Sequence, residues 1–138
     1  MKRKLVGIGA VLTAGLIIAW LGHSLLSSSF RRALPRNASD IHSFPQSYAL
    51  SQGHYYYLRA RLPEGDFLPY VRRLGLPHYS ADRKLKSSSG DIDWGSAPRS
   101  LEWWTPSPSR SNTYGREDTE LVLAKWEDGY VYVKYYCD

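Results

Sequence analysis

Residues Leu121–Tyr136, with the sequence LVLAKWEDGYVYVKYY, have the pattern of a β-hairpin. Two runs rich in β-branched and aromatic residues flank Asp128-Gly129, a pair whose backbone suits a two-residue hairpin loop. The pairs predicted across the two strands are Glu127 with Tyr130, Trp126 with Val131, Ala124 with Val133, and Val122 with Tyr135.

This pairing supports itself, because it places the apolar side chains of both strands on one side. That apolar face consists of Val122, Ala124, Trp126, Val131, Val133 and Tyr135. The opposite face carries Lys125, Tyr132, Lys134 and Tyr136, together with Leu121 and Leu123.

A strand and a helix are expected upstream of the hairpin. Tyr55–Leu62 alternates as a strand does, and Phe67–Leu74 has apolar residues at helical spacing. Asp66 is the expected helix cap, which would place Pro69 in the first turn, where its missing N–H is harmless. The sequence Gly75-Leu76-Pro77 predicts that the helix ends there.

The remaining segments predict little regular structure. In residues 37–42, Asn37 or Ser39 is expected to cap a short helical turn, which Pro45 prevents from extending. Residues 78–118 are rich in Ser, Pro and Gly, and no long element is expected in them. A short edge strand is possible within residues 43–50 or 100–105.

The order strand, helix, long loop, hairpin predicts an α+β domain. Its simplest form is an antiparallel sheet of three or more strands, with the 67–74 helix packed on the apolar face. Residues 37–138 are long enough for one small domain with one core.

A transmembrane helix is predicted before this domain. Leu5 to Leu26 is a run of 22 residues without Asp, Glu, Lys or Arg, and it follows Lys2, Arg3 and Lys4. About 20 apolar residues cross a bilayer as a helix. The run is long for a secretory signal and lacks an Ala-x-Ala cleavage site, which favours an uncleaved signal anchor. The alternative is cleavage near Ser29, which would release a secreted or periplasmic domain.

The predicted topology is that of a single-pass protein of the plasma (inner) membrane. The positive N-terminus favours a cytoplasmic tail of residues 1–4, a span of residues 5–26, a stalk of residues 27–36 and an extracytoplasmic domain of residues 37–138. The lipid bilayer is therefore the first expected partner.

The charge distribution argues against a nucleic-acid partner. The protein has a net charge of +5, but six of its 18 Lys and Arg residues flank the predicted span. Residues 37–138 contain the other 12 Lys and Arg together with 13 Asp and Glu, so the positive charge lies outside this region. A nucleic-acid binder should carry a positive surface of its own.

No motif for catalysis, a metal or a cofactor is recognisable. His42, His54 and His78 lie apart without metal-ligand spacing, and one cysteine excludes an intrachain disulfide. The sequence contains neither G-x-S-x-G nor a phosphate-binding glycine loop. We therefore expect no metal and no cofactor.

The second face of the sheet leaves two alternatives open. Either residues 78–118 fold over it and bury their tryptophans, or it is an exposed aromatic and cationic surface that binds a protein or a glycan. The candidate binding residues are Tyr55, Tyr57, Arg59, Trp103, Trp104, Tyr132 and Tyr136.

The leading hypothesis for function is a membrane-anchored, non-enzymatic envelope protein whose outward domain binds a protein or a glycan. A small envelope hydrolase, using one of the three histidines with a nearby carboxylate, is the rival hypothesis. An inhibitor or immunity-type protein held at the membrane is a third.

Overall fold

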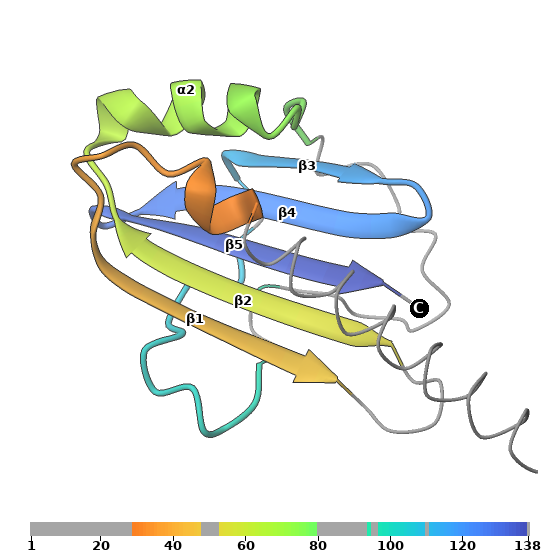
Figure 1. The fold of residues 1–138 in the computed structure, drawn as a ribbon. Coiled ribbons are helices and arrows are strands. Elements are labelled where there is room, and N and C mark those ends of the chain that lie inside the picture. Colours follow the sequence, from red (N-terminus) through yellow and green to blue (C-terminus); the bar gives the residue numbers. More distant parts are fainter. Residues whose placement is uncertain (1–28, 48–52, 80–93, 95–96, 110, 138) are drawn as a thin grey trace, which may run out of the picture. The chain divides into compact units, whose positions relative to one another are not determined.

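The computed structural model describes residues 29–47, 53–79, 94, 97–109 and 111–137 (Figure 1). The chain divides into two compact units, Met1–Arg32 and Ala33–Asp138, and residues 29–32 of the first are helical. The predicted span of residues 5–26 lies outside the described residues. Within those residues, no helix has both the length and the apolarity needed to cross a bilayer.

The second unit is a small α+β domain with a five-stranded antiparallel sheet and one short helix, which confirms the predicted class. The strands follow the order β1-β2-β5-β4-β3 across the sheet. Their bounds are β1 Ser39–Ser47, β2 His54–Arg61, β3 Thr113–Glu117, β4 Glu120–Glu127 and β5 Tyr130–Cys137, and the helix α2 spans Glu64–Arg73. The sheet is larger than the three strands that the sequence required.

The β4–β5 hairpin forms with the predicted register. All four expected residue pairs are present, from Glu127 with Tyr130 to Val122 with Tyr135. Asp128 has φ 52° and Gly129 has φ 84°, so both loop residues adopt the left-handed conformation of a type I′ turn. This turn and the alternation of side chains therefore act together to set the register.

The start of α2 differs from the prediction. The helix begins at Glu64 after Pro63, with no side-chain cap, so the expected capping role of Asp66 is wrong. The Asp66 carboxylate instead accepts a hydrogen bond from Asn37 Nδ2 at 2.7 Å. Because the helix starts earlier, Pro69 lies inside it rather than in its first turn.

The end of α2 confirms the predicted stop. Leu76 N–H donates to Val71 O at 3.0 Å and Gly75 N–H donates to Arg72 O at 3.0 Å, with Gly75 at φ 66°. These two bonds form a Schellman motif, which satisfies carbonyls that the helix itself leaves unpaired.

The helical turn expected in residues 37–42 is wrong, because most of this segment belongs to strand β1. Pairing with β2 overrides the local capping signal, and the register shifts between Ser39 and His42. Asp40 lies in this irregularity with φ 47°, a conformation that Asp tolerates better than most residues. Pro45 is accommodated because β1 is an edge strand, where a missing N–H need not break the ladder.

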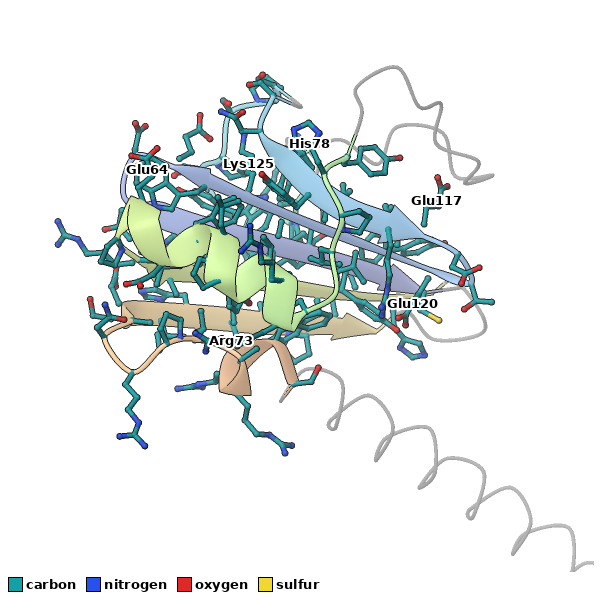
Figure 2. All side chains as sticks on the ribbon, turned by 90° about the horizontal axis from the view of Figure 1, so that it is seen from above. Glu64, Arg73, His78, Glu117, Glu120 and Lys125 are labelled. Carbon is teal, nitrogen blue, oxygen red and sulfur yellow. The ribbon has the colours of Figure 1, made fainter. Side chains whose placement is uncertain are left out.

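The face of the sheet under α2, here called the helix face, is apolar. Its buried residues are Tyr56, Leu58, Ala60, Val122, Ala124, Val131, Val133 and Tyr135. The helix contributes Phe67, Tyr70 and Val71 to the same core, and Phe67 meets Tyr114 edge to face at 5.5 Å. Figure 2, seen from above, shows α2 lying across the sheet.

The opposite face, here called the tryptophan face, is covered by residues of the long connection. Trp94, Leu101 and Trp104 form one buried cluster with the sheet residues Tyr57, Leu121, Leu123, Tyr132 and Tyr136. Figure 1 shows residues 97–109 of this connection on the side of the sheet away from α2. Of the two alternatives left open by the sequence, coverage is found for the described residues of the 78–118 segment, with Trp94 and Trp104 buried on this face.

Candidate binding site at the hairpin end of the sheet

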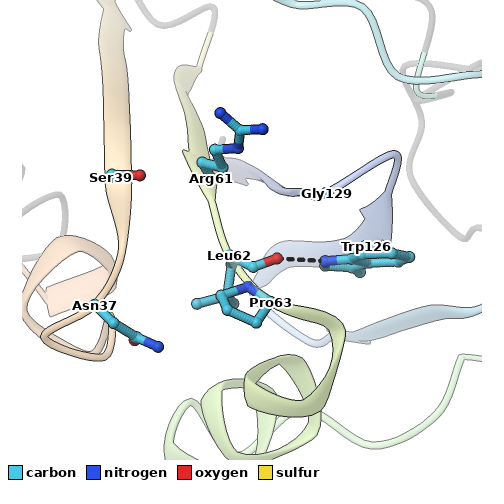
Figure 3. Close-up of a pocket in the computed structure, with 7 residues that line it drawn as sticks. All are labelled: Asn37, Ser39, Arg61, Leu62, Pro63, Trp126 and Gly129. Atoms are coloured by element: carbon cyan, nitrogen blue, oxygen red, sulfur yellow. Dashed lines mark hydrogen bonds between the residues drawn. The ribbon is translucent and has the colours of Figure 1, made fainter.

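A pocket opens where β1 begins, β2 ends and the β4–β5 hairpin turns. It has a volume of about 280 Å³. The lining residues come from three separate chain segments and are Asn37, Ser39, Arg61, Leu62, Pro63, Trp126 and Gly129 (Figure 3).

Hydrogen bonds hold the walls of the pocket in place. Trp126 Nε1–H donates to Leu62 O at 2.7 Å, so the half-buried indole has a fixed orientation. Leu62 N–H donates in turn to Gly129 O at 2.9 Å, which joins the end of β2 to the hairpin turn. The apolar part of the lining is therefore preorganised.

The chain leading into β1 places Asn37 at the pocket. Arg73 Nη1 donates to Ala33 O at 3.0 Å, and four residues later Asn37 Nδ2 donates to Asp66. Residues 33–37 therefore run alongside α2 from its C-terminal end to its first turn. Sequence proximity alone gave no sign that Asn37 would lie near Arg61 and Trp126.

A charged cluster, consisting of Asp40, His42, Arg59, Trp103 and Tyr130, adjoins the pocket along the same strands. Asp40 Oδ1 accepts a hydrogen bond from His42 Nε2 at 2.8 Å, and Asp40 Oδ2 accepts one from Arg59 Nη2 at 2.9 Å. Arg59 Nη1 also donates to Trp103 O at 2.9 Å, and its guanidinium lies 4.6 Å from the centre of the Tyr130 ring.

The contacts of Asp40 favour its ionised form. The hydrogen bond from His42 has the largest effect, and with the charge of Arg59 it outweighs the opposing effect of burial and lowers the pKa of the Asp40 carboxyl below its ordinary value. The Asp40 carboxylate thus balances one arginine and fixes one nitrogen of the His42 ring. This arrangement resembles the base-orienting part of a catalytic dyad in geometry, but neither residue lines the pocket.

The structure separates the seven predicted binding residues into two groups. Tyr57, Trp104, Tyr132 and Tyr136 are buried in the tryptophan-face core. Tyr55, Arg59 and Trp103 are half-buried at its border. The seven thus do not form one exposed surface.

The two adjacent tryptophans illustrate this separation. Trp104 is buried and its Nε1–H donates to Trp94 O at 3.1 Å, whereas the half-buried Trp103 stacks on His42 at 5.5 Å. Arg59 and Trp103 therefore remain at the candidate site as members of the charged cluster.

Sequence reasoning missed the pocket residues. The sequence predicts Asn37 and Ser39 as helix caps and Trp126 as part of an apolar face; Arg61, on a strand face, could either clamp an anion or be a routine solvent-facing arginine. The pairing of β5 with β2 brings the strand end at Arg61 next to the Asp128-Gly129 turn. The sequence indicates the strand end and the turn separately, but it does not indicate this pairing.

Within the described residues, no group of three or more His, Cys, Asp or Glu side chains is arranged to hold a metal ion. Comparisons with protein-family models, with curated proteins and with solved structures gave no match to this chain.

Proposed function

We propose that this protein is a membrane-tethered, non-enzymatic binding protein whose outward domain recognises a glycan in the hairpin-end pocket. The observation that carries the proposal is the composition of that pocket. It combines an amide, a hydroxyl and a guanidinium with the indole of Trp126 and the ring of Pro63. Sugar recognition needs hydrogen-bonding groups beside an apolar surface, because a sugar ring presents both hydroxyls and C–H groups.

The size of the pocket supports a small unit as its occupant. Ligand pockets typically have volumes of about 300–1,000 Å³, and this one lies just below that range. One sugar ring at the end or along the side of a chain is the natural occupant. The fixed Trp126 and Leu62 lower the cost of ordering the site when the ligand binds.

The test of glycan binding uses the full chain in detergent micelles. Glucose, N-acetylglucosamine and glucuronate are titrated, and binding is followed by calorimetry and by tryptophan fluorescence. Ser39→Phe, which fills the pocket, is expected to lower affinity at least tenfold. Ser43→Phe places the same side chain at an exposed site on the same edge strand and should leave binding unchanged. If none of the sugars binds, the proposal is wrong.

The membrane tether is tested separately by mass spectrometry of the mature protein in the membrane fraction. The proposal expects the full-length mass, because the predicted span of residues 5–26 remains attached. A mass that lacks about the first 29 residues would instead support the secreted or periplasmic form.

Protein binding, as in an inhibitor or immunity-type protein, is a second candidate function. It is favoured by the half-buried Trp103 and His42 beside β1, the edge strand of the sheet. Aromatic residues at such borders are common in protein interfaces. In that case Trp103→Ser would abolish partner binding, whereas Ser39→Phe would leave it intact.

The hydrolase hypothesis has one observation in its favour, the 2.8 Å contact between His42 and Asp40. A general base also needs a substrate pocket within reach of its free nitrogen. Because neither residue lines the described pocket, we rank a hydrolase below a binding protein.

A further inference from the structure

Arg61 differs from the other cations of the described strands in having no partner. Arg59, Arg116 and Lys125 each form an ion pair at 2.9 Å. Lys134 is buried, with its ammonium 5.8 Å from the Tyr57 ring centre. The exposed side chain of Arg61 forms no hydrogen bond or ion pair within the described residues. It is therefore the strand cation that is free to bind a ligand.

Two carboxylates near the pocket, Asp40 and Asp66, are already engaged. Asp40 binds Arg59 and His42, and Asp66 accepts a hydrogen bond from Asn37. The exposed Asp128 belongs to the adjoining turn but does not line the pocket. Arg61 thus supplies the unbalanced charge among the lining residues, and that charge is positive.

The position of Arg61 places this charge beside groups that suit hydroxyls. Arg61 is the last residue of β2 and pairs in register with Ser39. In Figure 3 the Arg61 side chain extends from the strand on the side away from Leu62 and Pro63, while Asn37 and Ser39 come from the neighbouring segment. The lining of the pocket thus includes a guanidinium, a hydroxyl and an amide.

We infer that the pocket selects a sugar that carries a carboxylate, such as a uronic acid. This inference rests on the proposed glycan-binding function and adds the charge of the ligand to it. The planar guanidinium matches a carboxylate through two parallel hydrogen bonds, which are stronger than bonds between neutral groups. The ring hydroxyls then bind Ser39 and Asn37.

The test compares three probes, glucuronate, glucose and glucose 6-phosphate, on the full chain in micelles. We expect glucuronate to bind about tenfold more tightly than glucose, which equals about 1.4 kcal/mol. Raising the salt concentration should reduce this preference, because an exposed charge pair is screened.

Arg61→Gln is expected to remove the preference while weak glucose binding remains. Arg99→Gln, at an exposed arginine that does not line the pocket, is the matched control and should keep the preference. Equal affinity for glucose and glucuronate, or a preference that survives Arg61→Gln, overturns the inference and leaves glycan binding standing. Tighter binding of glucose 6-phosphate overturns the carboxylate assignment. Failure of the wild-type chain to bind any sugar overturns both proposals.

Discussion

The two faces of the sheet are buried by different means. The helix face is covered by α2, and its buried sheet residues are aliphatic or aromatic. The tryptophan face is covered by an irregular segment, and it includes two buried lysines, Lys125 and Lys134. A helix satisfies its own backbone, so it can lie on an apolar surface, whereas an irregular segment must find external partners for its polar groups.

Lys125 shows how the sheet supplies those partners. Its ammonium donates to Ser107 O at 2.6 Å, to Ser107 Oγ at 3.0 Å and to Ser109 O at 3.3 Å. It also pairs with Glu127 at 2.9 Å, and Glu127 accepts a bond from Ser107 N–H at 2.8 Å. A buried cation thus holds the segment that follows the tryptophan cluster.

The largest effect is expected at the centre of the tryptophan face. Trp94 is fully buried and its Nε1–H donates to Thr113 Oγ1 at 3.3 Å. Trp94→Ala should lower the free energy of unfolding by about 3–5 kcal/mol, through lost burial and a residual cavity. Val71→Ala on α2 should cost about 2 kcal/mol. Denaturant unfolding measures both, and an equal or smaller loss for Trp94→Ala would contradict a structural role for this cluster.

The polar contribution is tested at Lys125. Lys125→Met keeps most of the apolar stem but removes the ion pair and three hydrogen bonds, so we expect a loss of about 2–3 kcal/mol. Arg116→Met breaks an exposed pair with Glu120 at 2.9 Å and should cost about 0.5 kcal/mol. Similar losses in the two variants would show that the buried ammonium does not hold the 107–109 segment.

Substitutions of two glycines compare how closely the sheet and the helix are packed. A Cβ on Gly115 would lie 2.5 Å from Val122 O and 2.7 Å from Leu123 Cδ2, whereas one on Gly65 in α2 meets nothing within 4 Å. Gly115→Ala should therefore destabilise the domain by about 1–3 kcal/mol. Gly65→Ala should stabilise it by about 0.5 kcal/mol, because alanine favours the helix. Thermal unfolding of both variants checks the two opposite signs.

The smallest effect is expected in the pH dependence. Burial acts to raise the pKa of Glu127, but hydrogen bonds from Ser107 and Lys125 outweigh it and lower that pKa below its ordinary value of 4.5. A lowered folded-state pKa contributes stability above about pH 4.5, and this contribution is lost as the pH falls. Glu127→Gln should therefore flatten the decline in stability between pH 5 and pH 3, relative to wild type.

The control for this measurement is Glu102→Gln, which removes a carboxylate at an exposed position. Its decline should follow that of the wild type. If Glu127→Gln also follows the wild type, the Lys125–Glu127 contact does not contribute to stability in acid.

Local sequence signals predicted those elements whose cause is local. The Asp128-Gly129 turn, the alternation along β2, β4 and β5, and the Gly75-Leu76-Pro77 stop all formed as expected. The capping signals at Asn37, Ser39 and Asp66 failed, because strand pairing and a side-chain bond to a distant residue competed with them.

The candidate site was far less predictable than the fold. Aromatic and cationic residues were correctly placed on the second face of the sheet, but burial of Tyr57, Tyr132 and Tyr136 depends on where Trp94 and Trp104 pack. The pocket brings together Ser39, Arg61 and Trp126, which are far apart in the chain. The residue pattern within one segment does not predict which distant segments will lie beside it.

By itself, the sequence determined the α+β class, the hairpin register and the end of α2, because turn chemistry and side-chain alternation act over a few residues. Only the tertiary structure decided that residues around Trp94 and Trp104 cover the second face, that Arg61 has no partner among the described residues and that three chain segments line a pocket. These outcomes depend on competition between distant groups for the same surface and the same hydrogen bonds, and that competition is resolved only when the whole domain packs.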